Sequence, residues 1–231
     1  KDYPLYQIGQ RVGSVFQNPR TQFYNVDTTS EIVFGCENMA LPVPEMRERL
    51  EETAHSLKLE KLLNRSLFAL SGGEKQKIAC ASADAIHPDI FVLDEPSSNL
   101  DIATIEDLIG VIRHWQSEKK TVIVAEHRLY YLMDLTDRFL CVQKGKIVRE
   151  FTAQQMKALS NEEIRALGLR TPNLHQIEQT EIPSAATSEV VLEVKKLNHS
   201  FGETIVAKDV DFQCRKGEVV ALIGPNGTGK S

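Results

Sequence analysis

The chain has 231 residues, of which 42% are hydrophobic and 26% are charged, so it can bury a core and wholesale disorder is excluded. Its 27 basic and 32 acidic residues leave a formal charge of −5, which gives no electrostatic case for binding DNA or RNA. Its four scattered cysteines form no CxxC pair, so neither a disulfide framework nor a zinc site is predicted. No stretch approaches the roughly 20 consecutive apolar residues of a membrane helix, so no membrane span is predicted.

A mostly helical region is predicted over residues 30–87. One apolar stripe at helical spacing follows Pro44, a residue that suits the first turn of a helix: Met46, Leu50, Ala54 and Leu57. We therefore expect a helical subdomain that is attached to a sheet.

Three short apolar runs lack polar alternation and predict strands covered on both faces of a parallel sheet: 90–93, 122–125 and 219–223. Between the first two runs, an apolar stripe at helical spacing predicts a helix: Ile102, Ile105, Ile109, Ile112 and Trp115. Asp101 is placed to cap the start of this helix. Strand, helix and strand in this order form a crossover unit of an α/β sheet.

The C-terminal third predicts shorter elements. Residues 140–148 predict a hairpin that turns at Lys144 and Gly145. Ser160 and Glu163 form a capping-box pattern that predicts a short helix. From residue 190, alternating apolar residues predict antiparallel strands ahead of the run at 219–223.

The change in pattern divides the chain. Residues 171–188 are polar with few apolar anchors and predict a linker. We therefore expect one domain over residues 1–170 and the start of a second over residues 189–231.

The last eight residues carry the strongest motif, G-x-x-x-x-G-K-S, and follow a strand-like run as a phosphate-binding loop requires: Gly224, Pro225, Asn226, Gly227, Thr228, Gly229, Lys230 and Ser231. Glycines let backbone N–H groups surround phosphate oxygens. We expect Lys230 to neutralise the β and γ phosphates of a nucleotide, and the Ser231 hydroxyl to bind Mg²⁺. A chance glycine-rich turn is the alternative.

Two further segments carry chemistry. Asp94 and Glu95 directly follow a predicted parallel strand, at the end where open α/β sheets bind ligands. There Asp94 can hold Mg²⁺ through water and Glu95 can polarise an attacking water, although a structural capping pair is the alternative. Upstream, a helix start with a serine and two glycines can bind an anion or be ordinary capping: Ser71, Gly72, Gly73 and Glu74.

Three single residues have both functional and structural interpretations. His127 ends a predicted strand and can donate a hydrogen bond to a γ-phosphate, or serve the fold. Gln17 lies before a proline turn, where a polar surface residue is ordinary. Phe201 can stack on an adenine or fill a core.

Together these residues resemble ABC-type ATPases over nearly the whole chain. The resemblance assigns a Q-loop to Gln17, a signature to residues 70–74, a D-loop to residues 98–101 including Asp101, a switch histidine to His127 and an adenine-stacking aromatic to Phe201. It implies a P-loop ATPase fold with a mostly parallel sheet, a helical subdomain and an antiparallel β part. It also implies ATP and Mg²⁺, with Glu95 as base and three magnesium contacts: Gln17, Asp94 and Ser231.

The stretch VFQNP at 15–19 and the stretch EHRLYY at 126–131 look like the energy-coupling-factor branch, whose members serve cobalt and vitamin uptake. That similarity implies an integral membrane partner subunit and a place at the cytoplasmic face of the plasma membrane. Glu74 departs from the glutamine of most family members and adds a negative charge near phosphate.

The order of motifs is unusual, because the phosphate loop comes last. In the family it precedes the Q-loop, so the chain looks like a fragment of a tandem ATPase, incomplete at both ends, with a second ATPase domain in the same polypeptide. The family's head-to-tail pairing then makes residues 224–231 and 71–74 opposite walls of one ATP site. We also expect residues 190–223 to dock on the first domain in place of its N-terminal strands.

Two other functions remain open at this point. One is a soluble ABC-type ATPase not linked to transport, although such proteins carry long helical insertions that do not occur between residues 101 and 190. The other is that these 231 residues alone are a non-catalytic piece that binds nucleotide weakly.

Overall fold

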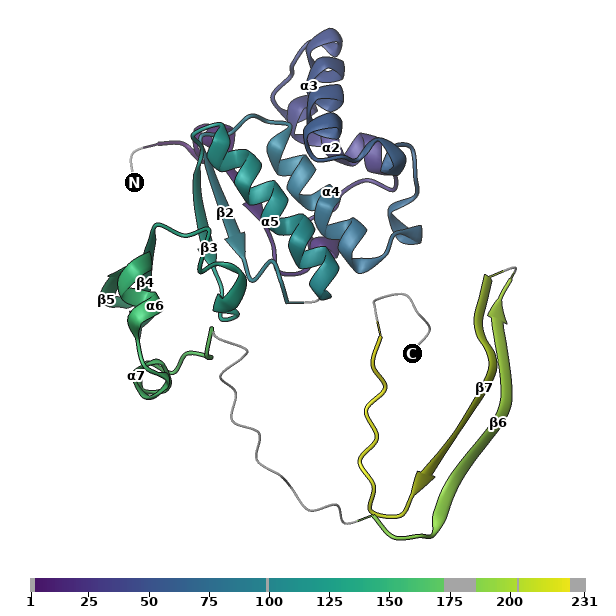
Figure 1. Ribbon diagram of the computed structural model, residues 1–231. Coiled ribbons are helices and arrows are strands. Elements are labelled where there is room, and N and C mark those ends of the chain that lie inside the picture. The colour runs from purple at the N-terminus through teal and green to yellow at the C-terminus, as the bar shows by residue number, and fades with distance from the viewer. Residues whose placement is uncertain (1–2, 99, 173–185, 203, 225–231) are drawn as a thin grey trace. The chain divides into compact units, whose positions relative to one another are not determined.

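The computed structural model describes four stretches of the chain: residues 3–98, 100–172, 186–202 and 204–224. The chain divides into two compact units, Lys1–Ile177 and Glu178–Ser231, and each is described by itself (Figure 1). The expected docking of residues 190–223 on the first domain stays a prediction.

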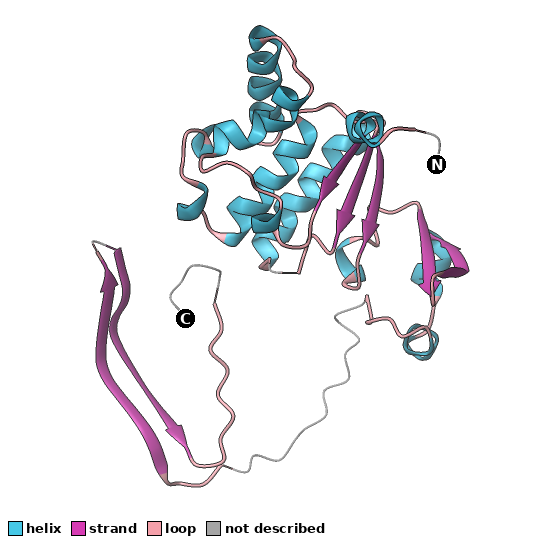
Figure 2. Ribbon diagram, turned by 180° about the vertical axis from the view of Figure 1, so that it is seen from behind, coloured by secondary structure: helices cyan, strands magenta, loops and turns pink. Residues whose placement is uncertain are grey.

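The first unit is built on a parallel sheet of three strands in the order β1-β2-β3: β1 (Val12–Val15), β2 (Ile90–Asp94) and β3 (Thr121–Ala125). Leu93 of β2 aligns with Val15 on one side and with Val124 on the other. The helix α5 (Ile102–Ser117) joins β2 to β3 and lies against one face of the sheet, which confirms the predicted crossover (Figures 1 and 2).

Helix α5 begins as predicted and packs by an aromatic pair. Its N-cap Asp101 accepts a hydrogen bond from the backbone N–H of Thr104 at 2.9 Å. Phe91 of β2 and Trp115 of α5 stack with ring centroids 3.7 Å apart and planes 9° apart. Ile102, in the first turn of the helix, is 75% exposed, whereas Ile105, Ile112 and Trp115 of the same stripe are buried.

A helical subdomain precedes β2, which confirms the prediction for residues 30–87. It contains three α-helices and two short 3₁₀ turns: α2 (Thr28–Asn38), α3 (Val43–Ser56), η2 (Glu60–Leu62), η3 (Leu67–Ala69) and α4 (Gly72–Asp84). Ala54 and Leu57 of the predicted stripe are buried, while Met46 and Leu50 pack at the edge of the same core. Outside the subdomain, this unit also contains the short helices α1 (Leu5–Arg11), η1 (Pro19–Thr21) and η4 (Leu129–Tyr131).

A buried carboxylate ties three helices of this unit together. Asp84, the last residue of α4, accepts hydrogen bonds from Trp115 Nε1 at 2.7 Å and from Thr53 Oγ1 at 3.2 Å. Burial raises the pKa of Asp84, although the hydrogen bond from Trp115 and the charge of His114 oppose the change. The core therefore contains an acid that the fold favours in its neutral form.

The rest of the first unit is a hairpin followed by two short helices: β4 (Arg138–Gln143), β5 (Lys146–Thr152), α6 (Ala153–Ala158) and α7 (Asn161–Ala166). Lys144 and Gly145 have φ of 48° and 74°, the left-handed pair that two-residue hairpin turns require. Ser160 and Glu163 form the predicted capping box of α7. Both sequence predictions here are confirmed.

The second unit contains one long hairpin, β6 (Val190–Phe201) with β7 (Thr204–Arg215), and this confirms the predicted antiparallel strands. The strand predicted at 219–223 is wrong, because those residues have no regular structure and Val219 is 96% exposed. A buried-type strand needs hydrogen-bonded neighbours, and among the described strands β6 and β7 pair only with each other.

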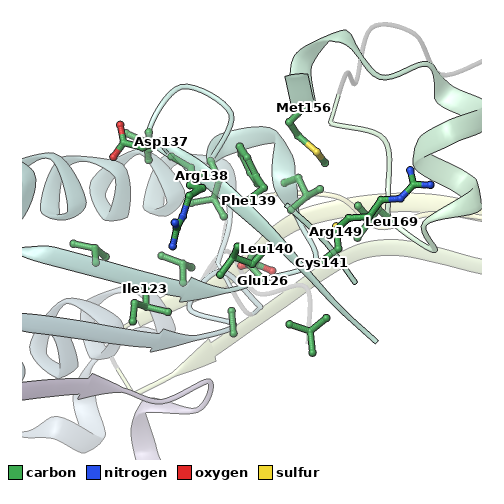
Figure 3. Close-up of a pocket in the computed structure, with 18 of the residues that line it drawn as sticks. Ile123, Glu126, Asp137, Arg138, Phe139, Leu140, Cys141, Arg149, Met156 and Leu169 are labelled. Atoms are coloured by element: carbon green, nitrogen blue, oxygen red, sulfur yellow. The ribbon is translucent and has the colours of Figure 1, made fainter. Parts of the chain in front are cut away.

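A groove of about 1370 Å³ lies along β3 in the first unit. Its other walls come from β4, β5, α6 and α7, and Figure 3 shows Ile123, Phe139 and Met156 among the lining. Among the described strands, β3 pairs only with β2, and Ile123 is 54% exposed. In the part of the chain that the structure describes, the β3 edge of the sheet is therefore open.

The cysteines divide into two classes by burial. Cys36 and Cys80 are buried in the first unit, whereas Cys141 and Cys214 are half-buried, and all four are free thiols. Burial raises the pKa of Cys80 to about 12. Among the described residues, no helix has both the length and the apolar character that a membrane crossing needs.

Candidate active site

Residues far apart in the sequence meet at the carboxyl edge of the parallel sheet (Figure 2). Gln17 follows β1 by two residues, and Asp94 ends β2 with Glu95 next to it. His127 follows β3 by two residues. Open parallel sheets bind their ligands at this edge, and we name Gln17, Glu95 and His127 the strand-end cluster.

Glu95 is the centre of the strand-end cluster. Its Oε2 accepts a hydrogen bond from Gln17 Nε2 at 2.9 Å, and the same oxygen lies 3.6 Å from His127 Nδ1. The second distance exceeds a hydrogen bond but allows an ion pair when the histidine is protonated. The structure thus brings together a carboxylate, an amide and an imidazole that the sequence had placed in three separate motifs.

The carboxylate and the imidazole are accessible to a ligand. The side chains of Glu95 and His127 are 36% and 42% exposed. The backbone of Glu95 has φ of +39°, a left-handed conformation that is rare for a residue with a side chain, and its N–H donates to the carbonyl of Ala125 at 2.8 Å. Strained residues of this kind cluster at functional sites, where the neighbouring structure holds them.

Two of the three predicted magnesium contacts lie at the same sheet edge. Asp94 and Gln17 are both exposed and offer a carboxylate and an amide oxygen, donors that suit Mg²⁺. The described residues contain no group of three or more acidic, histidine or cysteine side chains that could hold a metal alone. The donor set therefore fits a Mg²⁺ held largely by water and nucleotide phosphate, while Ser231 lies outside the described residues.

The signature segment, residues 71–74, forms the start of α4. Ser71 is the N-cap and makes a capping box with Glu74: Glu74 N–H donates to Ser71 Oγ at 3.3 Å, and Ser71 N–H donates to Glu74 Oε2 at 2.8 Å. Arg65 Nη1 lies 2.9 Å from Glu74 Oε1. Burial raises the pKa of Glu74, but the hydrogen bonds from Ser71 and the Arg65 guanidinium outweigh it and hold the pKa below its usual value. The negative charge that sets this signature apart is thus balanced within its own domain.

A glycine of the signature segment makes a close packing contact with α5. A Cβ added to Gly73 would lie 2.6 Å from Thr104 Cγ2 and 2.7 Å from Thr104 Oγ1. Thr104 is in turn fixed by Asp101, whose Oδ1 accepts from both its N–H and its hydroxyl. In the structure Asp101 therefore acts as a helix cap that holds the wall behind Gly73, and its predicted contact with nucleotide stays a prediction.

Glu126, next to His127, is a buried acid for which the sequence predicts no role. Glu126 has no exposed side-chain surface and accepts hydrogen bonds from Ser97 Oγ at 2.5 Å and Tyr131 Oη at 3.0 Å. Burial raises its pKa, but those donors and the N–H groups of Arg128 and His127 outweigh burial and lower it. Nothing in a single Glu-His pair distinguishes a buried acid from an exposed one, so the sequence offered no signal.

Most of the predicted phosphate loop, residues 225–231, lies outside the described residues. Gly224 is the last residue described and has no regular secondary structure. Phe201 ends β6, and its side chain also lies outside what is described. Their contacts with a nucleotide remain predictions.

Comparisons with known proteins agree with this fold. Residues 2–98 match the family described as ABC transporter. The solved structure of cbiO1 from Clostridium perfringens, described as part of the ABC transporter complex cbiONQ, superposes with a TM-score of 0.62 at 27% identity, over 72% of this chain and 66% of that chain. The fold is that of a P-loop ABC ATPase, as predicted, and the family match over residues 2–98 agrees with it.

Curated relatives extend the similarity along nearly the whole chain. A putative ABC transporter ATP-binding protein of Treponema denticola is 44% identical over 98% of this chain and 47% of its own length. A putative HMP/thiamine import ATP-binding protein of Bacillus subtilis, YkoD, is 32% identical over 97% of this chain and 45% of its own length. The chain spans about half the length of the curated relatives it matches.

Proposed function

We propose that the chain is part of an ATP-hydrolysing subunit that drives an ABC-type uptake transporter. The observation that carries this proposal is the contact of Glu95 with Gln17 and His127 at the carboxyl edge of the sheet. In this role Glu95 takes a proton from the attacking water, His127 donates to the γ-phosphate, and Gln17 orients Glu95 through its amide. Asp94 and Gln17 would help to hold Mg²⁺, which neutralises phosphate charge when bound.

We propose further that the whole protein holds two such domains, with residues 1–170 in the first, residues 171–188 as linker and residues 189–231 opening the second. The relatives' doubled length supports this arrangement. The open edge of β3 supports it as well, because the groove beside it has room for the strand that would precede the first domain's own phosphate loop.

The transported solute is proposed to be a vitamin or a metal ion. Support comes from the thiamine import named for the Bacillus subtilis relative and from the cbiONQ complex named for the solved neighbour. The subunit would act at the cytoplasmic face of the plasma membrane, bound to an integral membrane partner.

An exposed apolar surface beside Gln17 suits that partner. The N–H of Leu67 donates to the carbonyl of Val26, which brings η3 next to the segment that follows η1. Four large apolar side chains here are 47% to 81% exposed: Phe16, Tyr24, Val26 and Phe68. Exposed apolar patches of this kind mark interaction sites.

The test is ATP hydrolysis by the full-length polypeptide, reconstituted in vesicles with its membrane partner subunits. We expect phosphate release that depends on Mg²⁺, and uptake of thiamine or a divalent cation into vesicles that requires ATP. Hydrolysis without uptake of any such solute would contradict the transport role, and absence of hydrolysis would contradict the ATPase role.

A further inference from the structure

The loop that carries His127 is tied to the turn that follows β2 by a network of buried hydrogen bonds. Glu126 Oε1 accepts from the backbone N–H groups of His127 at 2.8 Å and of Arg128 at 3.0 Å. Glu126 Oε2 accepts from the hydroxyls of Ser97 and Tyr131. One carboxylate therefore receives four donors: two backbone N–H groups of its own loop, the Tyr131 hydroxyl of η4 and the Ser97 hydroxyl of the turn after β2.

A second connection runs in parallel through a guanidinium. Arg128 donates from Nη1 to the carbonyl of Ser97 at 3.1 Å and from Nη2 to the carbonyl of Ser98 at 3.2 Å. Ser98 is itself linked to Glu95, whose carbonyl accepts its N–H at 3.1 Å. The turn that carries Glu95 and the loop that carries His127 thus share two independent clamps.

The clamps lie on the side of the loop away from solvent. Ser97 is fully buried and Glu126 has no exposed side-chain surface, whereas His127 remains 42% exposed. A buried charge is held in place only where its donors are fixed, and four donors around one carboxylate leave it little freedom to rotate. The exposed histidine therefore takes its position from buried neighbours.

From this geometry we propose that Glu126 and Arg128 are positioning residues, which hold His127 and the Ser97–Ser98 segment in one fixed arrangement around Glu95. The inference deepens the proposed ATPase function and rests on it for its effect on turnover. Its structural part, the mutual dependence of loop and turn, stands without nucleotide.

The structural part is tested by amide hydrogen exchange on the full-length polypeptide without nucleotide. In Glu126→Ala we expect exchange at Ser97, Ser98 and His127 to accelerate at least about tenfold, because the amides lose the contacts that keep the segment closed. Glu126→Gln should stay within about threefold of the parent, since its oxygen still accepts from the backbone and both hydroxyls can rotate to accept from its amide. The matched control is Glu106→Ala, at an exposed position of α5.

Unchanged exchange at Ser97 and Ser98 in Glu126→Ala would overturn the proposal. Should that variant fail to fold, Arg128→Ala and Ser97→Ala decide the question, because each removes one clamp at the edge of the network. Accelerated exchange at the loop residue His127 in Ser97→Ala supports the proposal, and unchanged exchange there overturns it.

The functional part is a split between turnover and binding. In Glu126→Ala we expect kcat to fall at least about tenfold while KM and the affinity for a non-hydrolysable ATP analogue change less than about threefold, as for a misplaced catalytic group. An equal loss in the Glu106→Ala control, or a loss confined to KM, would overturn this part. If the parent protein hydrolyses no ATP, the proposed function fails, and the exchange experiment still decides whether the loop and turn are coupled.

Discussion

The strand-end cluster and the signature segment are built in different ways. The cluster consists of side chains from three strands, and the 2.9 Å contact between Gln17 and Glu95 spans 78 residues of sequence. The signature segment is continuous, and its charged side chain is already bound by Ser71 and Arg65. In the first case the sheet topology delivers chemical groups, whereas in the second a helix start offers backbone N–H groups.

This difference teaches which kinds of substitution each region tolerates. In the strand-end cluster, Glu95 and His127 are partly exposed, so we expect their substitution to leave the core nearly unchanged. The expected loss is in the proposed ATP hydrolysis. In the signature segment, Gly73 packs against Thr104, so a single methyl group affects the fold as well as the site. Four substitutions test this contrast.

Glu95→Gln should lower the rate of ATP hydrolysis and leave the fold unchanged. Loss of a general base costs about a hundredfold or more in kcat, while the free energy of unfolding should stay within about 0.5 kcal/mol because the side chain is partly exposed. Phosphate release and thermal unfolding of the full-length polypeptide measure the two effects. Glu106→Gln is the control, and equal turnover in both variants would remove Glu95 from the role of base.

Gly73→Ala should destabilise the fold by about 1 to 3 kcal/mol, because the new Cβ overlaps Thr104. Gly110→Ala is the matched control on α5, where a Cβ meets nothing within 4 Å and alanine should stabilise by up to about 1 kcal/mol. Denaturant unfolding compares the two. Gly73→Ala as stable as the parent would show that the signature segment is as tolerant as the strand-end cluster.

Asp84→Asn tests the opposite end of α4, where burial raises the pKa of the acid. For such a group the stabilising contribution is present at low pH and is lost as pH rises above the ordinary value of 3.8 through the raised value. Asparagine keeps both hydrogen bonds without a charge, so the variant should gain on the parent by at most about 1.4 kcal/mol per pH unit. Unfolding curves from pH 4 to 7 measure this gain, and parallel curves would refute it.

Glu74→Gln should have the smallest effect. Glutamine can still accept the Ser71 N–H, and the lost pair with Arg65 is 41% and 32% exposed, so the free energy of unfolding should change by less than about 0.5 kcal/mol. We expect ATP turnover within about twofold of the parent. A large rise in turnover would mean that the charge of Glu74 reaches the nucleotide despite Arg65.

Much of the fold was predictable because local patterns and tertiary packing agree. The apolar runs at 90–93 and 122–125 became neighbouring strands, and Asp101 and Ser160 became the caps that their spacing indicates. The run at 219–223 failed because a strand forms only with partners, which a linear pattern does not supply.

The site was predictable in its exposed members and not in its buried ones. Gln17, Glu95 and His127 were found through motifs, and the structure adds that they converge. Glu126 escaped because burial of an acid depends on donors that come from 29 residues away, as in the case of Ser97. The same holds for Gly73, whose importance depends on Thr104 in another helix.

The difference in burial between the cysteines allows selective labelling of the two half-buried thiols. A thiol with a pKa of about 12, as in Cys80, stays protonated at neutral pH and reacts poorly with maleimides, and the buried Cys36 is sheltered from them as well. The half-buried Cys141 and Cys214 lie in different units, one in each. A donor and an acceptor dye attached to these two positions would report changes in the distance between the two units.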